Sequence, residues 1–256
     1  MTFPILVVAK NTHLEMIRDR VLYFVVVFTI LFMGLSFAIG QLSYNEIFRL
    51  SVSLGLSGIH LCYAGLTIFL GCSVFYREIE HKTIYTLLIR PITRSEYLLG
   101  KYLGLLSLLF TMLLGFLICF TGIELLLGMP ILLTSYYSFF GFFLESMILL
   151  AVTFFFSSFA KPFLSITGSL AFWLIGHWVY NLESFIAKSD SVTFKVFGRF
   201  IQRTFPDLEL LNWRAFAIAK EHVIPFELVS AIVATLLWAA LFFMISLLIF
   251  RGKDLD

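Results

Sequence analysis

The chain has 256 residues, of which 60% are hydrophobic and only 13% are charged. Soluble domains carry about a quarter charged residues, so this composition excludes an ordinary soluble enzyme. The net charge of only +2 argues against a nucleic-acid-binding protein, which needs a basic surface. Disorder is excluded because disordered chains have low hydropathy. The composition is that of an integral membrane protein.

The first segment, residues 4–20, mixes apolar and charged positions. Ile5, Val8, Leu14 and Ile17 alternate with charged residues at helical spacing. This pattern predicts an interfacial helix that places one face in the lipid headgroups and the other in water.

Six apolar segments follow, each close to the length of about 20 residues that a helix needs to cross the hydrocarbon core. We therefore predict an all-α integral membrane protein with six transmembrane helices. The predicted spans are residues 21–40, 53–76, 98–123, 135–160, 162–182 and 228–250.

The distribution of Lys and Arg predicts the orientation. An even number of spans places both termini on one side, and that side carries 11 of the 18 Lys and Arg residues. Six of the other seven lie in one long segment, residues 183–227. By the positive-inside rule, both termini are predicted to be cytoplasmic, in a bacterial cytoplasmic membrane.

The cytoplasmic loop at residues 77–96 is charged, and its sequence favours ordered structure. Its first part can form a short amphipathic helix, and Pro91 disfavours helix at the residue before it. Ser95 is a plausible N-cap for the helix that leads into the third span. This loop is predicted to be a docking surface for a cytosolic partner, the alternative being a solvated connection.

The long outer segment, residues 183–227, is too polar to span a membrane. It is predicted to form two amphipathic helices on the outer leaflet, with Trp213 at the interface. The first helix would present Val196, Phe197, Phe200 and Ile201. The second, after Pro206, would present Leu208, Leu211, Phe216 and Ala219.

This layout resembles the permease subunit of an ABC-2-type exporter, and most closely permeases similar to those of gliding-motility and nitrous-oxide-reductase maturation systems. The specific part of the resemblance lies around the loop after the second span. Lys82 stands where relatives often have Gly. The residues that carry it are Glu78, Glu80, Lys82-Thr83, Leu87-Leu88, Arg90-Pro91-Ile92-Thr93-Arg94, Gly100-Lys101, Phe205-Pro206-Asp207-Leu208 and Arg251-Gly252-Lys253-Asp254.

The resemblance implies a dimer, formed with a second copy or with a similar permease, and two separate cytosolic ATPase subunits that bind ATP and Mg. The loop after the second span would be the coupling helix seated in the ATPase. The residues expected to couple to the ATPase are Arg77, Glu78, Glu80, His81, Lys82, Thr83, Arg90, Pro91 and Arg94.

The chain itself shows no signature of catalysis or cofactor binding. The Gly-Lys pair Gly100-Lys101 is followed by Tyr102 and preceded at the required spacing by Ser95, so it does not match the phosphate-binding GxxxxGK[ST] loop. HExxH and GxSxG are absent. The three cysteines have no metal-ligand spacing and are expected to be packing residues. No cofactor is predicted in this chain.

Three polar residues within the predicted spans form a candidate intramembrane site, namely Glu145, His60 and His177. A carboxylate inside a span is costly and is a functional-site hypothesis by default. Glu145 could line a substrate path, carry a proton, or pair with a histidine or a neighbouring helix. Each histidine is expected to be a hydrogen-bonded interior residue rather than a metal ligand.

Two other classes of function stay open at this point. One is an ion-coupled secondary transporter or channel, although such folds often show paired repeats and this chain has no convincing repeat. The other is a membrane anchor that recruits a cytosolic partner without transport. A path lined by Phe, Leu and Ile would suit a lipid or an amphipathic substrate.

Overall fold

The computed structural model describes residues 4–41, 47–80, 93–126, 128, 133–189, 191–214 and 225–252, and these residues are helical throughout apart from short connections. No strand occurs in those ranges. The elements are α1 (Pro4–Met16), α2 (Arg20–Gln41), α3 (Ile47–Glu80), α5 (Arg94–Leu126), α6 (Leu133–Phe159), α7 (Pro162–Lys188), α8 (Val192–Thr204), the 3₁₀ helix η1 (Leu208–Leu211) and α10 (Pro225–Gly252).

Five of the described helices, α3, α5, α6, α7 and α10, are long and apolar enough to cross a membrane. In α2 the apolar stretch is shorter, Val25–Ile39. Many side chains that point away from the bundle are also large and apolar, including Leu31, Ile118 and Leu237, each about two-thirds exposed. An apolar outer surface of this kind suits contact with lipid chains, where the backbone must satisfy its own hydrogen bonds.

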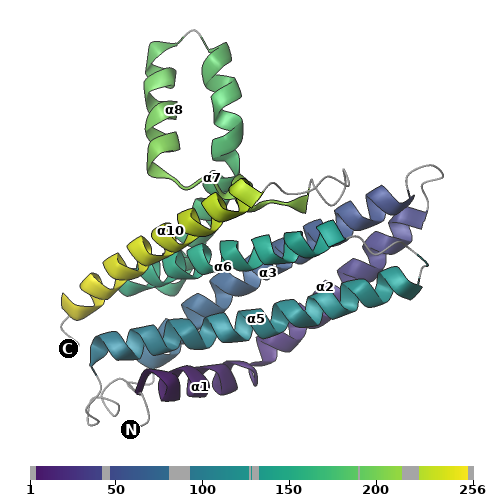
Figure 1. The fold of residues 1–256 in the computed structure, drawn as a ribbon. Helices are drawn as coiled ribbons and strands as arrows, with labels where there is room; N and C mark the ends of the chain where they lie inside the picture. The colour runs from purple at the N-terminus through teal and green to yellow at the C-terminus, as the bar shows by residue number, and fades with distance from the viewer. Residues whose placement is uncertain are drawn as a thin grey trace.

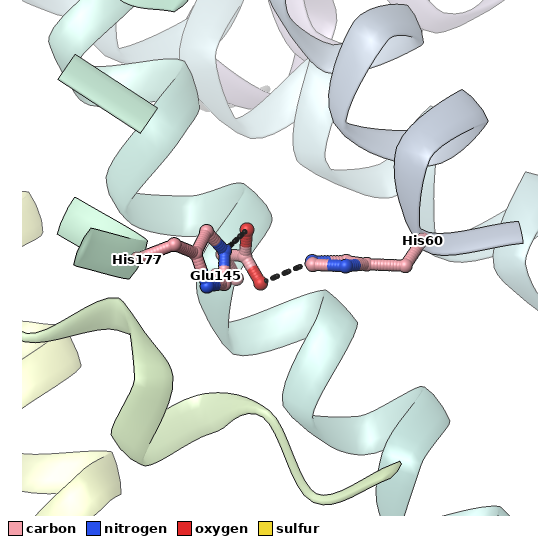
Figure 2. A group of neighbouring side chains, drawn as sticks. All are labelled: His60, Glu145 and His177. Carbon is pink, nitrogen blue, oxygen red and sulfur yellow. Dashed lines mark hydrogen bonds and ion pairs between the residues drawn. The ribbon is translucent and has the colours of Figure 1, made fainter. Parts of the chain in front are cut away.

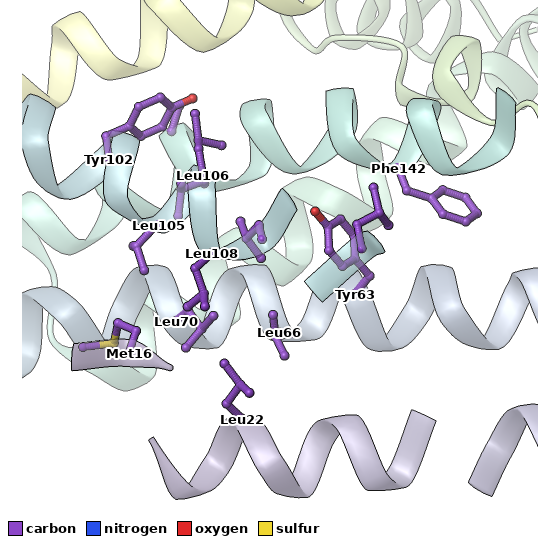
Figure 3. Close-up of a cluster of buried hydrophobic side chains, with 14 of the residues drawn as sticks. Met16, Leu22, Tyr63, Leu66, Leu70, Tyr102, Leu105, Leu106, Leu108 and Phe142 are labelled. Carbon is purple, nitrogen blue, oxygen red and sulfur yellow. The ribbon is translucent and has the colours of Figure 1, made fainter. Parts of the chain in front are cut away.

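The main core lies between α2, α3, α5, α6 and α10 (Figure 1). Figure 3 shows part of it, with Leu22 of α2 facing Leu66 and Leu70 of α3, and Leu105 and Leu108 of α5 above them. Lipid chains are as apolar as leucine, so these contacts stabilise the bundle through close packing rather than through removal from water.

Helix α1 packs against α5 through two glycines of α5. A Cβ atom on Gly104 would lie 2.6 Å from the carbonyl oxygen of Ala9, and one on Gly100 would lie 2.7 Å from Cβ of Val8. The buried residues of α1 are Val8, Thr12 and Met16. The prediction that the apolar face of this helix rests in headgroups is therefore corrected at Val8, which contacts protein.

We predict that Gly104→Ala separates α1 from α5, because the new methyl group would meet the backbone of Ala9. Overpacking of this kind costs about 1–3 kcal/mol, seen as a lower midpoint of thermal unfolding in detergent. Gly115→Ala in the same helix is the control, since a Cβ there meets nothing within 4 Å. Equal unfolding midpoints for the two variants would refute the close α1–α5 contact.

Helix α5 begins with a capping box rather than at the predicted cap. Thr93 Oγ1 accepts from the amide of Glu96 at 3.3 Å, and the Glu96 carboxylate accepts from the amide of Thr93 at 2.9 Å. This reciprocal pattern satisfies two unpaired donors of the first turn. The prediction of Ser95 as N-cap was wrong, because Ser95 already lies inside the helix and accepts from Arg251 at the end of α10.

Both ends of the described chain lie at the same end of the bundle (Figure 1). The carbonyl of Ile5 lies beside Gly100, and Arg251 binds Ser95, so both are near the start of α5. The end of α3 lies there too. The connection between α3 and α5 therefore starts and finishes at this end.

The segment after α7 forms a hairpin and then returns to the bundle. Helix α8 begins at the N-cap Ser191 and packs antiparallel to the end of α7, with Gly198 against Ile186. Figure 1 shows this α7–α8 hairpin projecting from the bundle. Val196, Phe197 and Phe200 are exposed on α8, as expected for the first amphipathic helix.

The second expected amphipathic helix differs from the prediction. In the described residues 206–213 the chain forms the four-residue η1, and Leu208, Leu211 and Trp213 are buried between α6 and α7. Two glycines admit this segment: Gly141 of α6 faces the carbonyl of Leu211, and Gly176 of α7 faces Leu208. Trp213 is thus a core residue rather than an interfacial one. Phe216 and Ala219 lie outside the described residues.

Candidate functional site

Glu145 is the centre of a buried polar cluster. It lies on α6, about 21 Å of helix from the end at Phe159 at ~1.5 Å per residue, and only 2% of its surface is exposed. His60 Nε2 lies 2.7 Å from Oε2, and His177 Nε2 lies 3.0 Å from Oε1. The indole N–H of Trp173 also donates to Oε1. Figure 2 shows the two imidazoles converging on the carboxylate from opposite sides.

Aromatic rings enclose this cluster. His60 stacks on Phe142 at a centroid distance of 4.8 Å and contacts the edge of His177 at 5.2 Å. Trp173 contacts both histidines. The low dielectric of such surroundings strengthens each hydrogen bond and makes a lost partner costly.

The cluster continues into the segment that follows α8. His177 Nδ1 lies 2.9 Å from Glu209 Oε2, and Asn212 donates to Glu209 Oε1 at 2.6 Å. Arg214 then donates to Asn212 at 2.6 Å and to Ser57 of α3 at 2.9 Å. The polar chain thus runs from α3 through α6, α7 and η1, and back to α3.

The two acids at the start of η1, Asp207 and Glu209, have pKa values shifted in opposite directions. Burial raises the pKa of Asp207, whose carboxylate accepts from the amide of Glu209. Burial would also raise the pKa of Glu209, but hydrogen bonds from His177 and Asn212 outweigh it and lower that pKa. Glu209 is therefore the anionic partner of His177 near neutral pH.

The two contacts of His177 with carboxylates require at least one proton each, unless a metal ion replaces one of them. Both of its ring nitrogens face carboxylate oxygens, Nε2 facing Glu145 and Nδ1 facing Glu209. A neutral imidazole has one N–H, and a carboxylate can bind the other nitrogen only through a further proton. His177 and its two carboxylate partners can therefore hold a positive charge, either a proton or a metal ion, next to the buried carboxylate of Glu145.

The structure thus brings together all three residues of the candidate intramembrane site, although they are 32 and 85 residues apart in sequence. Sequence reasoning missed Trp173, Glu209, Asn212 and Arg214. The two acids in Pro206-Asp207-Leu208-Glu209 were the only signal in the sequence for such a partner.

The expected coupling residues that the structure describes lie where α3 ends and α5 begins. Arg77, Glu78 and Glu80 end α3, and Arg94 starts α5 and donates to the carbonyl of Arg251 at 3.2 Å. Five other coupling residues lie outside the described part of the chain: His81, Lys82, Thr83, Arg90 and Pro91.

Comparison with known families assigns the chain. A family model described as ABC-2 family transporter protein matches residues 6–255, while none of the curated proteins compared with the chain matches it. The family match covers every described helix from α2 to α10 and most of α1. The chain therefore belongs to the ABC-2 transporter family, as a multi-pass membrane permease of ABC transporters.

Proposed function

We propose that this chain is the membrane-spanning subunit of an ATP-driven exporter. It would work as a dimer, with itself or with a similar permease, and would be driven by two separate ATPase subunits that bind ATP and Mg. The family match over residues 6–255 carries this proposal, because ABC-2 permeases generally work with ABC ATPases. The substrate would be a lipid or an amphipathic molecule, which a path lined by Phe, Leu and Ile would suit.

The proposal includes six spans, with α2 as the first. Both termini and residues 77–96 would then face the cytoplasm, as the Lys and Arg distribution favours. The ends of the described chain, the end of α3 and the start of α5 all lie at one end of the bundle (Figure 1). This supports the arrangement, because the side that holds the first and last described helix ends then also holds the ends of α3 and α5. An ATPase docked there would push on the ends of α3 and α5 together.

Charge reversal at Glu78 and Glu80 should release the ATPase or uncouple ATP hydrolysis from transport. We expect ATPase recovery with the tagged chain to fall about tenfold or more, the loss that follows when ~1.4 kcal/mol of interface energy is removed. The measurement is affinity purification from native membranes, with mass spectrometry of co-purified chains and the basal ATPase rate of the complex.

Glu183→Lys is the matched control, because this exposed acid lies near the C-terminal end of α7, in the hairpin that projects from the bundle. It should leave ATPase recovery unchanged. The proposal fails if the wild-type chain purifies without any ABC ATPase, or if Glu78→Lys and Glu80→Lys behave like Glu183→Lys.

A further inference from the structure

We infer that His60, Glu145 and His177 form a binding site for a divalent transition-metal ion of the zinc type. One potential ligand atom from each residue lies within 4.8 Å of the other two. The three side chains come from α3, α6 and α7, and Figure 2 shows both imidazoles directed at the one carboxylate. This inference goes beyond the proposed function and does not depend on it.

The distances are close to those that a metal ion requires. Nε2 of each histidine already lies 2.7 or 3.0 Å from an oxygen of Glu145. Adjacent ligand atoms around a tetrahedral zinc ion are about 3.4 Å apart, given Zn–N and Zn–O bonds of ~2.1 Å. Small side-chain rotations would open the hydrogen-bonded contacts to this spacing, with the ion in place of the protons.

The ligand chemistry selects the class of ion. Two imidazoles and one carboxylate are a common zinc ligand set. Calcium and magnesium prefer six or more oxygen ligands, and copper(I) prefers sulfur. None of the ligand atoms in this cluster is sulfur or a neutral oxygen, so an ion of the zinc type fits best.

The surrounding groups also match those of a metal site. Metal-binding histidines commonly donate their second ring N–H to a carboxylate, which orients the ring, and Glu209 occupies this position at Nδ1 of His177. With a metal ion bound, the Nδ1–H of a neutral His177 would serve Glu209, and its Nε2 lone pair would serve the metal. The ion would therefore supply the positive charge that otherwise requires an additional proton.

The position of the cluster also favours a metal ion over isolated hydrogen bonds. His60 and Glu145 are 4% and 2% exposed, so charge at Glu145 needs a compensating cation. Glu209 is partly exposed and connects to Asn212 and Arg214, so a polar route leads from the surface to the site.

The test uses the full-length protein with an affinity tag that lacks histidine, purified in detergent. The protein is loaded with Zn²⁺, dialysed against metal-free buffer and analysed for bound metal; Co²⁺ loading provides a visible absorption spectrum of the site. We expect about one ion per chain. His60→Gln and His177→Gln should retain almost none, and Glu209→Gln should weaken binding about 10–100-fold.

His13→Gln is the control, because His13 lies on α1 and binds only Ser107 among the described residues. It should bind metal like the wild type. The inference is overturned if the wild type retains no Zn²⁺ and gives no Co²⁺ spectrum. It is also overturned if folded His60→Gln or His177→Gln retains as much metal as His13→Gln. These readouts use neither ATP nor transport, so they are separate from the test of the exporter proposal.

Discussion

Replacing Glu145 by alanine should destabilise the protein by about 3–5 kcal/mol, the usual cost of removing one partner of a buried ion pair. Three side chains, His60, Trp173 and His177, direct nitrogen atoms at this carboxylate. Without it, those groups would remain buried without their acceptor. The expected result is a large fall in the midpoint of thermal unfolding in detergent.

Glu124 is the matched control, because it is 1% exposed but its Oε1 contacts no donor among the described residues. Glu124→Ala should therefore cost far less than Glu145→Ala. The result that would contradict the structure is an equal effect of the two substitutions, since that would mean that the hydrogen bonds to Glu145 contribute little.

Glu145→Gln separates function from folding. The amide keeps the shape of the side chain and one acceptor oxygen, so the protein should assemble normally. Its charge is lost, and with it the ability to hold a proton or metal ion between α6 and α7. We expect lower transport with intact assembly; unchanged transport would assign Glu145 a purely structural role.

The positions of the long helices could be read from the sequence because lipid imposes a length. Five of the six predicted spans fall within described helices, and the sixth, residues 135–160, extends one residue past the end of α6 at Phe159. Five of these helices meet the length and hydropathy expected of a span. Apolar runs bounded by charge are a property of one segment at a time, which a sequence shows directly.

The start of α5 and the outer segment were predicted wrongly for different reasons. Thr93 and Ser95 are both good caps in isolation, and the reciprocal bonds with Glu96 decide for Thr93; this capping box is a local pattern that the sequence contains. In the outer segment, by contrast, Leu208 and Leu211 have helical spacing, but Gly141 and Gly176 leave room for them inside the bundle. There tertiary packing outweighed local pattern.

The sequence predicted three residues of the candidate site but not how they are arranged. Polar groups within spans identified His60, Glu145 and His177, since each is costly in lipid. Their convergence could not be predicted, because it depends on how α3, α6 and α7 pack side by side. Glu209 reaches His177 only because η1 returns to the bundle, which no periodicity indicates.

Replacing Gly141 by alanine should displace η1 from the bundle. The Cβ atom would collide with the carbonyl oxygen of Leu211, which is backbone and cannot rotate away like a side chain. Overpacking costs about 1–3 kcal/mol and occasionally more. A shift of Leu211 would also move Glu209, two residues earlier, away from His177. We therefore expect lower thermal stability together with loss of the Glu209–His177 hydrogen bond.

Gly65→Ala is the control, because this glycine also lies in a long span helix and a Cβ there meets nothing within 4 Å. Alanine favours helix over glycine by about 0.5–1 kcal/mol, so Gly65→Ala should be as stable as the wild type or more so. The His177–Glu209 hydrogen bond can be tested through the retention of Zn²⁺. If His177 is a metal ligand, Gly141→Ala should weaken Zn²⁺ binding as Glu209→Gln does. A Gly141→Ala protein as stable as Gly65→Ala would show that η1 does not pack against α6. The hydrogen-bonded series from Glu145 to Arg214 would then not be held in place by the bundle.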